Sequence, residues 1–168
     1  PQDEYRPTEY GQKWMEMWLN EEKRLILAKK FLETRLIWGE KEFERISLPY
    51  PKNEAQNLYT SLQNAKTTND LLLSEAKFAK SLYACLANYY KINEFIRKPG
   101  EKKGQTTEEK VNSYLDHGNY IAYGYSAVTL HGLGVPFFLP VLHGKTRRGA
   151  LIFDLADLYK DWLVMPIA

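Results

Sequence analysis

Residues 69–92 read NDLLLSEAKFAKSLYACLANYYKI, and their apolar positions recur at the three- and four-residue spacing of a helix. On a helical wheel at about 100° per residue, one face collects Leu71, Phe78, Leu82, Leu86 and Tyr89, and the opposite face carries Lys77, Ser81 and Asn88. Glu75 falls in the middle of the apolar face. A carboxylate in that position is costly unless it is paired, protonated or bound to a metal. The wheel therefore predicts for Glu75 either a structural ion pair or a place in a functional site.

The remaining segments also have helical spacing. Helices are expected at about 8–46, with a bend where Asn20 can cap a second helix, and at about 54–64, 107–133 and 150–163. An interruption is expected near Gly118, and a surface loop over residues 97–104. No segment alternates for long enough to be a strand, so the sequence predicts one all-α domain over residues 1–168.

The composition narrows the class of protein. Apolar residues make up 44% and charged residues 26% of the chain, as in an ordinary globular domain. Cys85 is the one cysteine, which excludes an internal disulfide and a multi-cysteine metal site. No apolar run reaches the roughly 20 residues of a membrane span, and the polar N-terminal residues lack the apolar core of a signal peptide. We expect a cytoplasmic protein with no membrane contact.

The charges are unevenly distributed although the formal net charge is only +2. There is no Asp or Glu from His117 to Phe153, whereas Lys145, Arg147 and Arg148 fall in that stretch. A local positive charge of this kind matters more for a polyanionic ligand than the total does.

The expected last helix carries three carboxylates. Asp154, Asp157 and Asp161 are spaced by three and four residues, beside a predicted core stripe of Leu151, Leu155, Leu158 and Trp162. Side chains at these spacings are neighbours on a helix, and a divalent cation relieves the repulsion between their charges. A solvated acidic face beside a core stripe is the alternative.

His143 precedes the basic residues in an irregular, glycine-flanked segment, where the backbone can approach a phosphate. Gly144-Lys145-Thr146 is not a nucleotide-binding P-loop, because Leu139 stands where that motif requires glycine. Two other histidines are weaker candidates. We expect His131 to be a packed core side chain, while His117 could cap its helix or line a site.

Four ordered motifs resemble the Cas-one family, the CRISPR-associated endonuclease and integrase. They are LHGKTRRGALIFDLADL at 142–158, LDHGNYIAYG at 115–124, YRPTEY at 5–10, and LLLSEAK followed by KSLY within 71–83. The second and third motifs look like the type I-F branch in particular. The likeness runs in order from about residue 5 to residue 168.

The resemblance implies roles for residues that the spacing had only marked. It identifies Glu75, His143 and Asp157 as ligands of Mg²⁺ or Mn²⁺, and Asp154 as a further catalytic acidic residue. Lys145, Arg147 and Arg148 would hold DNA phosphates. The implied activity is metal-dependent DNA cleavage and the insertion of captured DNA, the spacer, into a CRISPR array. In that reaction a 3′-hydroxyl attacks a phosphodiester of the repeat.

The resemblance also implies an assembly. Members of the family have a β-rich N-terminal domain that this sequence lacks, so we expect a fragment of a longer bacterial or phage-encoded chain. The full-length protein would be a homodimer and would bind a Cas-two partner, which type I-F systems fuse to the Cas-three helicase-nuclease. Without the resemblance, two alternatives remain open: a helical nucleic-acid-binding module without catalysis, and a structural helical interaction domain.

Overall fold

The computed structural model describes residues 8–92, 95–100, 106–144 and 149–168. These residues form helices and contain no strand, so the predicted all-α class is confirmed. The helices are α1 (Glu9–Leu19), α2 (Glu21–Arg45), α3 (Lys52–Asn64), α4 (Thr68–Tyr89), α5 (Thr107–Gly132), α6 (Ala150–Ala156) and α7 (Lys160–Leu163).

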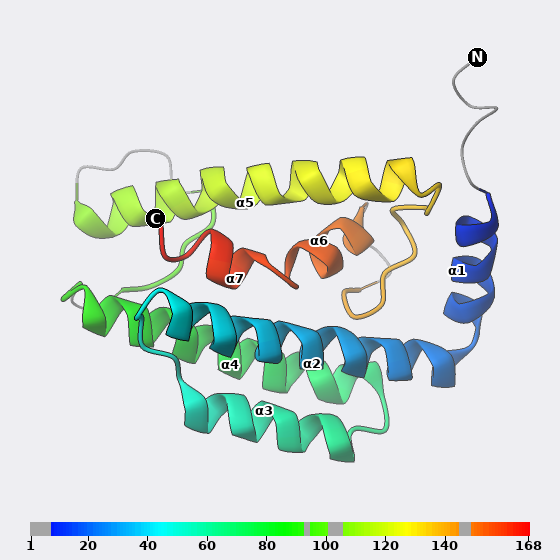
Figure 1. The fold of residues 1–168 in the computed structure, drawn as a ribbon, viewed down its shortest axis with the longest axis horizontal. Helices are drawn as coiled ribbons and strands as arrows, with labels where there is room; N and C mark the ends of the chain where they lie inside the picture. Colours follow the sequence, from blue (N-terminus) through cyan, green and yellow to red (C-terminus); the bar gives the residue numbers. More distant parts are fainter. Residues whose placement is uncertain (1–7, 93–94, 101–105, 145–148) are drawn as a thin grey trace.

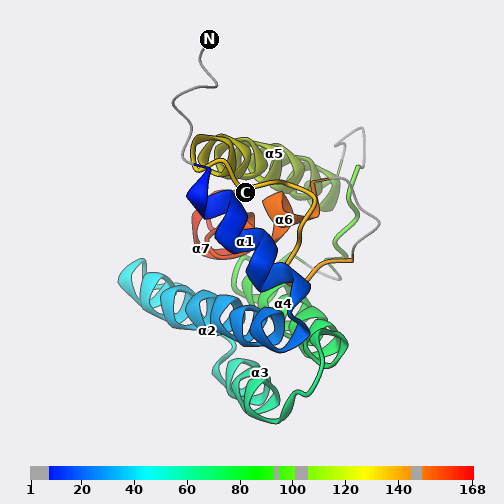
Figure 2. The same ribbon diagram turned by 90° about the vertical axis from the view of Figure 1, so that its right-hand side faces the viewer.

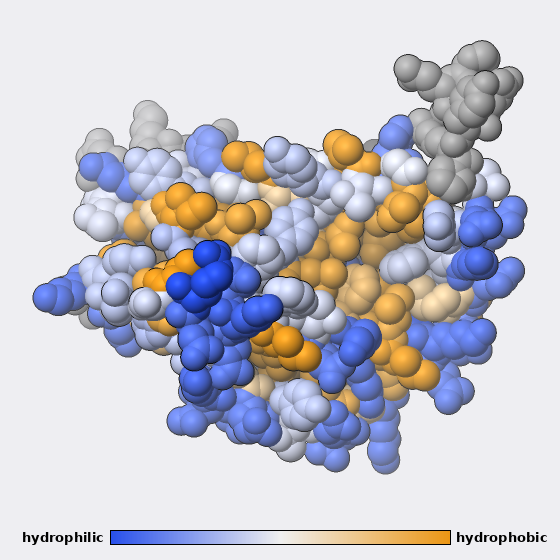
Figure 3. Space-filling view, viewed as in Figure 1, coloured by the Kyte–Doolittle hydropathy of each residue, from blue (hydrophilic) through white to orange (hydrophobic). Residues whose placement is uncertain are grey.

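The helices enclose the C-terminal segment. Helices α2, α3 and α4 lie together on one side, α5 runs along the other side, and the short α6 and α7 lie between them (Figure 1). Helix α1 crosses one end of the molecule between the two sides (Figure 2). Helix α3 packs on α4, and α6 packs on α5. Apolar surface is visible along the seam between α5 and the side formed by α2, α3 and α4 (Figure 3).

Side-chain caps define the starts of the long helices. The Asn20 side chain accepts a hydrogen bond from the backbone N–H of Lys23 at 2.9 Å, which confirms the expected bend between α1 and α2. Helix α4 begins with a capping box formed by Thr67 and Asp70. The wheel for α4 is correct at Leu71, Phe78, Leu82 and Leu86, which are buried, and wrong at the exposed Tyr89. Tyr89 is the last residue of α4, where its ring contacts Tyr90 instead of the core.

Helix α5 is continuous through Gly118, so the predicted interruption is wrong. A Cβ atom on Gly118 would lie 2.4 Å from Cγ1 of Val164. This glycine therefore allows the C-terminal segment to approach α5 closely and does not break the helix.

The expected last helix is divided in two, because the chain turns between α6 and α7. At this turn the Tyr159 hydroxyl donates to the carbonyl of Ala122 at 2.6 Å and lies 2.8 Å from the Ser126 hydroxyl, both on α5. The turn alters which side chains face inward. Of the predicted core stripe, Leu151 is fully buried, while Leu155, Leu158 and Trp162 are only half-buried.

Residues 97–100, the described part of the surface loop expected over residues 97–104, lie at the surface and are bound to α5, while residues 101–104 lie outside the described residues. Arg97 pairs with Asp116 and also donates to the Asn112 side chain at 3.0 Å. The backbone N–H of Gly100 donates to Asp116 at 2.7 Å. Burial opposes the charge of Asp116, but the bonds from Arg97 and Gly100 outweigh it and lower the pKa of this carboxyl.

Among the described helices, none is long and apolar enough to cross a membrane.

The Asp116 network predicts a pH-dependent contribution to stability. Because the pKa of Asp116 is lower in the folded chain than in the unfolded chain, its contribution is present near neutral pH and is lost as the pH falls through the folded pKa. Asp116→Asn should lower the urea midpoint at pH 7, and the difference from wild type should shrink steadily below about pH 4. A difference that stays constant from pH 7 to pH 3 would contradict the assignment.

Candidate metal and catalytic site

Arg35 is a buried arginine on α2 that joins carboxylates from two other helices. Its Nε donates to Oδ2 of Asp161 at 2.5 Å and its Nη2 donates to Oδ1 at 3.1 Å, so the pair with α7 is bidentate. Its Nη1 donates to Oε1 of Glu75 on α4. The Arg35 side chain is 2% exposed and that of Asp161 is 3% exposed. Of the two readings predicted for Glu75, the ion pair is thus observed, and it lies within a larger acidic cluster.

The charge of Arg35 is maintained by its partners. Burial opposes the charge, but Asp161, Glu75 and Asp157 outweigh it and hold the pKa of the guanidinium well above its ordinary value. The guanidinium also lies 5.7 Å from the ring centroid of Phe78, one turn after Glu75 on α4. Arg35 is therefore a fixed cation in the interior.

His143 is held by Asp154 of α6. The Nδ1 atom of His143 donates to Oδ1 of Asp154 at 2.5 Å, since a carboxylate can only accept. The same carboxylate accepts the backbone N–H groups of Val141 at 2.6 Å, Leu142 at 3.1 Å and His143 at 3.1 Å. Asp154 thus shapes the turn at 141–143 and orients the imidazole. This is the arrangement by which a carboxylate commonly supports a metal-binding histidine.

Helix α1 holds the segment that leads to His143. The indole N–H of Trp14 donates to the carbonyl of Leu139 at 3.0 Å, and that of Trp18 donates to the carbonyl of Pro140 at 2.8 Å. These two bonds satisfy backbone carbonyls in a segment that has no regular structure, and they fix its position against α1.

Asp157 faces His143 from the C-terminal end of α6. Its Oδ2 lies 4.0 Å from Nε2 of His143, the ring nitrogen that Asp154 does not use. Its Oδ1 forms an ion pair with Lys160 but is buried without a hydrogen bond in the described part of the chain. Burial opposes the charge of Lys160, but Asp157 outweighs it and raises the pKa of this amine. This carboxylate oxygen therefore already contacts one cation, and it is of the type that Mg²⁺ and Mn²⁺ prefer.

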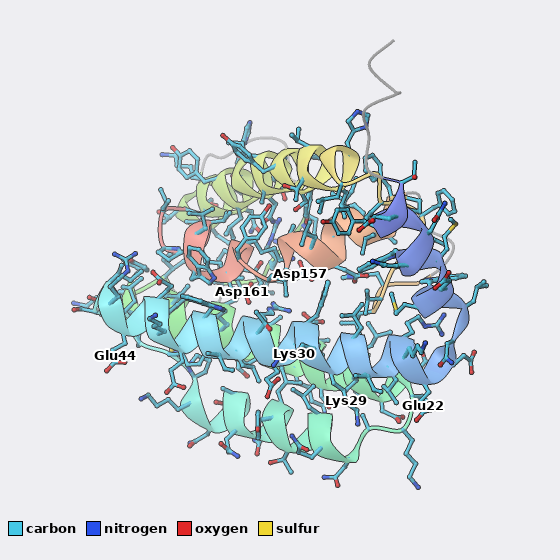
Figure 4. The ribbon with its side chains drawn as sticks, turned by 45° about the vertical axis from the view of Figure 1, so that its right-hand side comes forward. Glu22, Lys29, Lys30, Glu44, Asp157 and Asp161 are labelled. Atoms are coloured by element: carbon cyan, nitrogen blue, oxygen red, sulfur yellow. The ribbon has the colours of Figure 1, made fainter. Side chains whose placement is uncertain are left out.

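Glu75 belongs to the same cluster. It acts electrostatically on Arg35 and His143, as Asp157 does, and with Asp154 and Asp157 it raises the pKa of the imidazole. The largest effect on that pKa is the hydrogen bond to Asp154, and burial opposes it. Figure 4 shows Asp157 and Asp161 between α2 and the α6–α7 segment.

The fixed charges of the cluster do not balance. Within the described residues, four carboxylates (Glu75, Asp154, Asp157 and Asp161) meet two permanent cations (Arg35 and Lys160). With a neutral imidazole, this leaves an excess of two negative charges, the charge that one divalent cation carries. A buried excess of this size is unfavourable unless a cation or protons compensate it.

Glu75, His143 and Asp157 have the chemistry to hold such an ion, since carboxylate oxygens and an imidazole nitrogen are suitable ligands for Mn²⁺ and Mg²⁺. However, no three Asp, Glu, His or Cys side chains of the described residues are already arranged as a metal centre. Arg35 and Lys160 contact the carboxylates instead. Cation binding would require Lys160 to yield its contact with Oδ1 of Asp157, whereas Arg35 contacts only Oε1 of Glu75.

The structure gathers Glu75, His143, Asp154 and Asp157, the four residues expected to be catalytic, in one cluster. Asp154, Asp157 and Asp161 are buried, so a solvated acidic face is excluded. Lys145, Arg147 and Arg148 lie outside the described residues. The expectation for His131 is wrong, because it is exposed on α5. His117 is also exposed, and its ring contacts the Ser113 carbonyl.

Arg35 and Lys160 were not predicted to belong to the site. Arg35 continues the stripe of Leu25, Ala28 and Leu32 on α2, and an arginine on an apolar stripe is a signal that could have been used. Lys160 gave no such signal, because its three-residue spacing from Asp157 is also that of an ordinary surface pair.

A groove of about 650 Å³ opens beside His143. It lies between the starts of α2 and α4 and the segment at 140–144. Its lining includes the basic Arg24 and Lys66, the acidic Glu21 and Glu22, and the polar residues Thr67, Thr68 and Asn69. The groove gives a ligand access to the His143 side of the cluster.

Comparison with known proteins identifies the family. Residues 2–168 match the family model described as CRISPR associated protein Cas1. This chain belongs to the Cas1 family. It is 44% identical to the CRISPR-associated endonuclease Cas1 of Pectobacterium atrosepticum and 40% identical to that of Pseudomonas aeruginosa. Each alignment covers all of this chain but 53% and 54% of the relative, so the chain spans about half the length of these curated relatives.

Solved structures share the fold. A casposase bound to its integration product superimposes with a TM-score of 0.76 at 16% identity, over 95% of this chain and 49% of the other. A Cas1 protein from Thermotoga maritima gives a TM-score of 0.74 at 18% identity, over 94% and 50%. The family model and the curated relatives confirm the sequence resemblance to the Cas-one family, whereas its type I-F assignment stays a prediction.

The Asp154 contacts predict a substitution that disturbs the site and its turn together. Asp154→Ala removes the acceptor of three backbone N–H groups and of the His143 ring, so the free energy of unfolding should fall by roughly 2–4 kcal/mol. Urea unfolding measures this. Glu33→Ala, at a half-buried carboxylate that pairs with Lys30, is the matched control and should cost less than about 1 kcal/mol. Equal effects would contradict the structural role of Asp154.

Proposed function

We propose that this chain is the catalytic part of a divalent-metal-dependent DNA endonuclease and integrase that inserts captured DNA into a CRISPR array. The observation that carries the proposal is the cluster in which four carboxylates meet two permanent cations and Asp157 faces the ring nitrogen of His143 that Asp154 does not use. Support also comes from the relatives, which are named endonucleases, and from the casposase of the same fold, whose structure holds an integration product.

Each residue of the cluster has a task in this proposal. Glu75, His143 and Asp157 hold Mg²⁺ or Mn²⁺, which would polarise the scissile phosphodiester and offset its developing negative charge. Asp154 keeps Nδ1 of His143 occupied, so that Nε2 is directed toward Asp157. The groove beside His143 admits the DNA strand. The attacking group is the 3′-hydroxyl of the captured DNA during integration and water during cleavage.

The partners of the whole protein belong to the same proposal. DNA, as spacer and repeat, is the substrate. The family resemblance adds a homodimer and a Cas-two protein fused to the Cas-three helicase-nuclease.

Glu75→Gln tests the metal site directly. Arg35 keeps its bidentate partner Asp161, so the domain should remain folded, while the neutral amide is a much poorer ligand. Wild type should cleave labelled DNA with Mn²⁺ and not with EDTA. The variant should lose about a hundredfold or more of that rate, because metal-assisted charge stabilisation contributes several kcal/mol. Glu33→Gln, at a glutamate on α2 that pairs with Lys30 outside the cluster, is the control and should cleave like wild type.

The competing function would give a different result. A nucleic-acid-binding module would bind DNA equally well with Mn²⁺ or EDTA and would show no cleavage in either, whether Glu75 is present or replaced. That result would remove catalysis from the proposal.

The basic segment, which contains Lys145, Arg147 and Arg148, supplies a separate prediction about DNA binding. Replacing Arg147 and Arg148 by Ala should weaken DNA binding alike for different sequences, because phosphate contacts carry no base information. The slope of log K against log salt should fall by roughly 1 for each lost contact. Arg45→Ala, at an exposed arginine on α2, is the control and should leave the slope unchanged. A double variant with wild-type affinity and slope would assign the segment to another task.

A further inference from the structure

Asp161 uses both of its carboxylate oxygens on one partner. Its Oδ1 and Oδ2 accept from Nη2 and Nε of Arg35, which fixes the plane of the guanidinium. The two side chains are 2% and 3% exposed, and the two residues, one on α2 and one on α7, lie 126 positions apart in the sequence. Asp161 is not among the ligands that the family resemblance implies, so its role in the site acts through Arg35.

The third nitrogen of the fixed guanidinium, Nη1, is directed at Glu75. Nη1 contacts Oε1 of Glu75, so the pair uses one oxygen of the carboxylate. The ring of Phe78 lies near the guanidinium and limits its movement on the α4 side. Arg35 is therefore held by α7 and α4, and Glu75 is held by Arg35.

Glu75 needs such a constraint. Its long side chain is 15% exposed and shares the cluster with Asp157, whose like charge would drive it toward solvent. A glutamate also loses considerable rotamer freedom when it is immobilised. An attraction that holds its carboxylate inward before a ligand arrives removes part of that entropic cost from binding.

We propose that Arg35, anchored by Asp161, is a positioning residue that holds the Glu75 carboxylate toward His143 and Asp157 for metal binding. This inference rests on the proposed function, because it assigns a task to the Arg35–Asp161 pair in that same metal site. Residues that orient metal ligands typically change metal affinity by about 10- to 100-fold when they are replaced.

A double variant separates positioning from stability. Arg35→Met with Asp161→Leu replaces the buried pair by apolar side chains of similar size, a change that commonly leaves a fold as stable or more stable. The melting temperature without metal should therefore be near that of wild type. The Mn²⁺ dissociation constant, measured by titration calorimetry on the same 168-residue chain, should rise at least about tenfold. Arg45→Met with Glu42→Leu, an ion pair on the same helix with an exposed arginine, is the matched control and should bind Mn²⁺ like wild type.

The outcomes are distinguishable. If wild type does not bind Mn²⁺, the proposed function and this inference both fail. If wild type binds, Glu75→Gln does not, and the folded double variant binds like wild type, only the positioning role is wrong.

Arg35→Lys covers the case in which the double variant does not fold. It keeps a buried cation, but a single amine cannot reproduce the fork that joins Asp161 and Glu75. Its Mn²⁺ dissociation constant should also rise, and a wild-type value would overturn the inference.

Discussion

The guanidinium of Arg35 is the point at which three distant parts of the chain meet. It lies on α2, binds Asp161 of α7 and Glu75 of α4, and is buried among the helices that enclose the C-terminal segment. Replacing a buried pair of this kind by apolar side chains often costs no stability, so stability alone gives little reason to retain it. A functional role for the carboxylates that Arg35 binds is a better reason to retain the pair. The excess of carboxylates over permanent cations in the cluster agrees with such a role.

Hydrogen bonds from α1 and to Asp154 of α6 hold the rest of the site around this cluster. The indole N–H groups of Trp14 and Trp18 on α1 donate to the carbonyls of Leu139 and Pro140. Asp154 accepts hydrogen bonds from three successive backbone N–H groups and from the imidazole of His143. An irregular segment is thereby fixed well enough to present a side chain. The turn at Tyr159 brings Asp161 inward to Arg35.

Local patterns could predict the helices and most of the charged candidates. Glu75 stood out because it lies on an apolar face, and Asp154, Asp157 and Asp161 because of their spacing. The division between α6 and α7 could not be predicted, since it depends on hydrogen bonds from Tyr159 to α5, which is remote in sequence. The spacing of the aspartates left a metal site and a solvated face open. Their burial depends on partners outside the helix, such as Arg35 for Asp161 and the backbone of residues 141–143 for Asp154. Convergence of Glu75 with His143 followed from the family resemblance and not from any local pattern.

The cluster of Glu75, His143 and Asp157 is expected to bind a divalent cation. An anomalous-scattering map from crystals soaked in Mn²⁺ tests it most directly. The account predicts one strong peak within about 2.0–2.6 Å of ligand atoms from all three side chains, with Lys160 displaced from Asp157. A map without a peak there, in which Lys160 keeps its contact with Asp157, would contradict it.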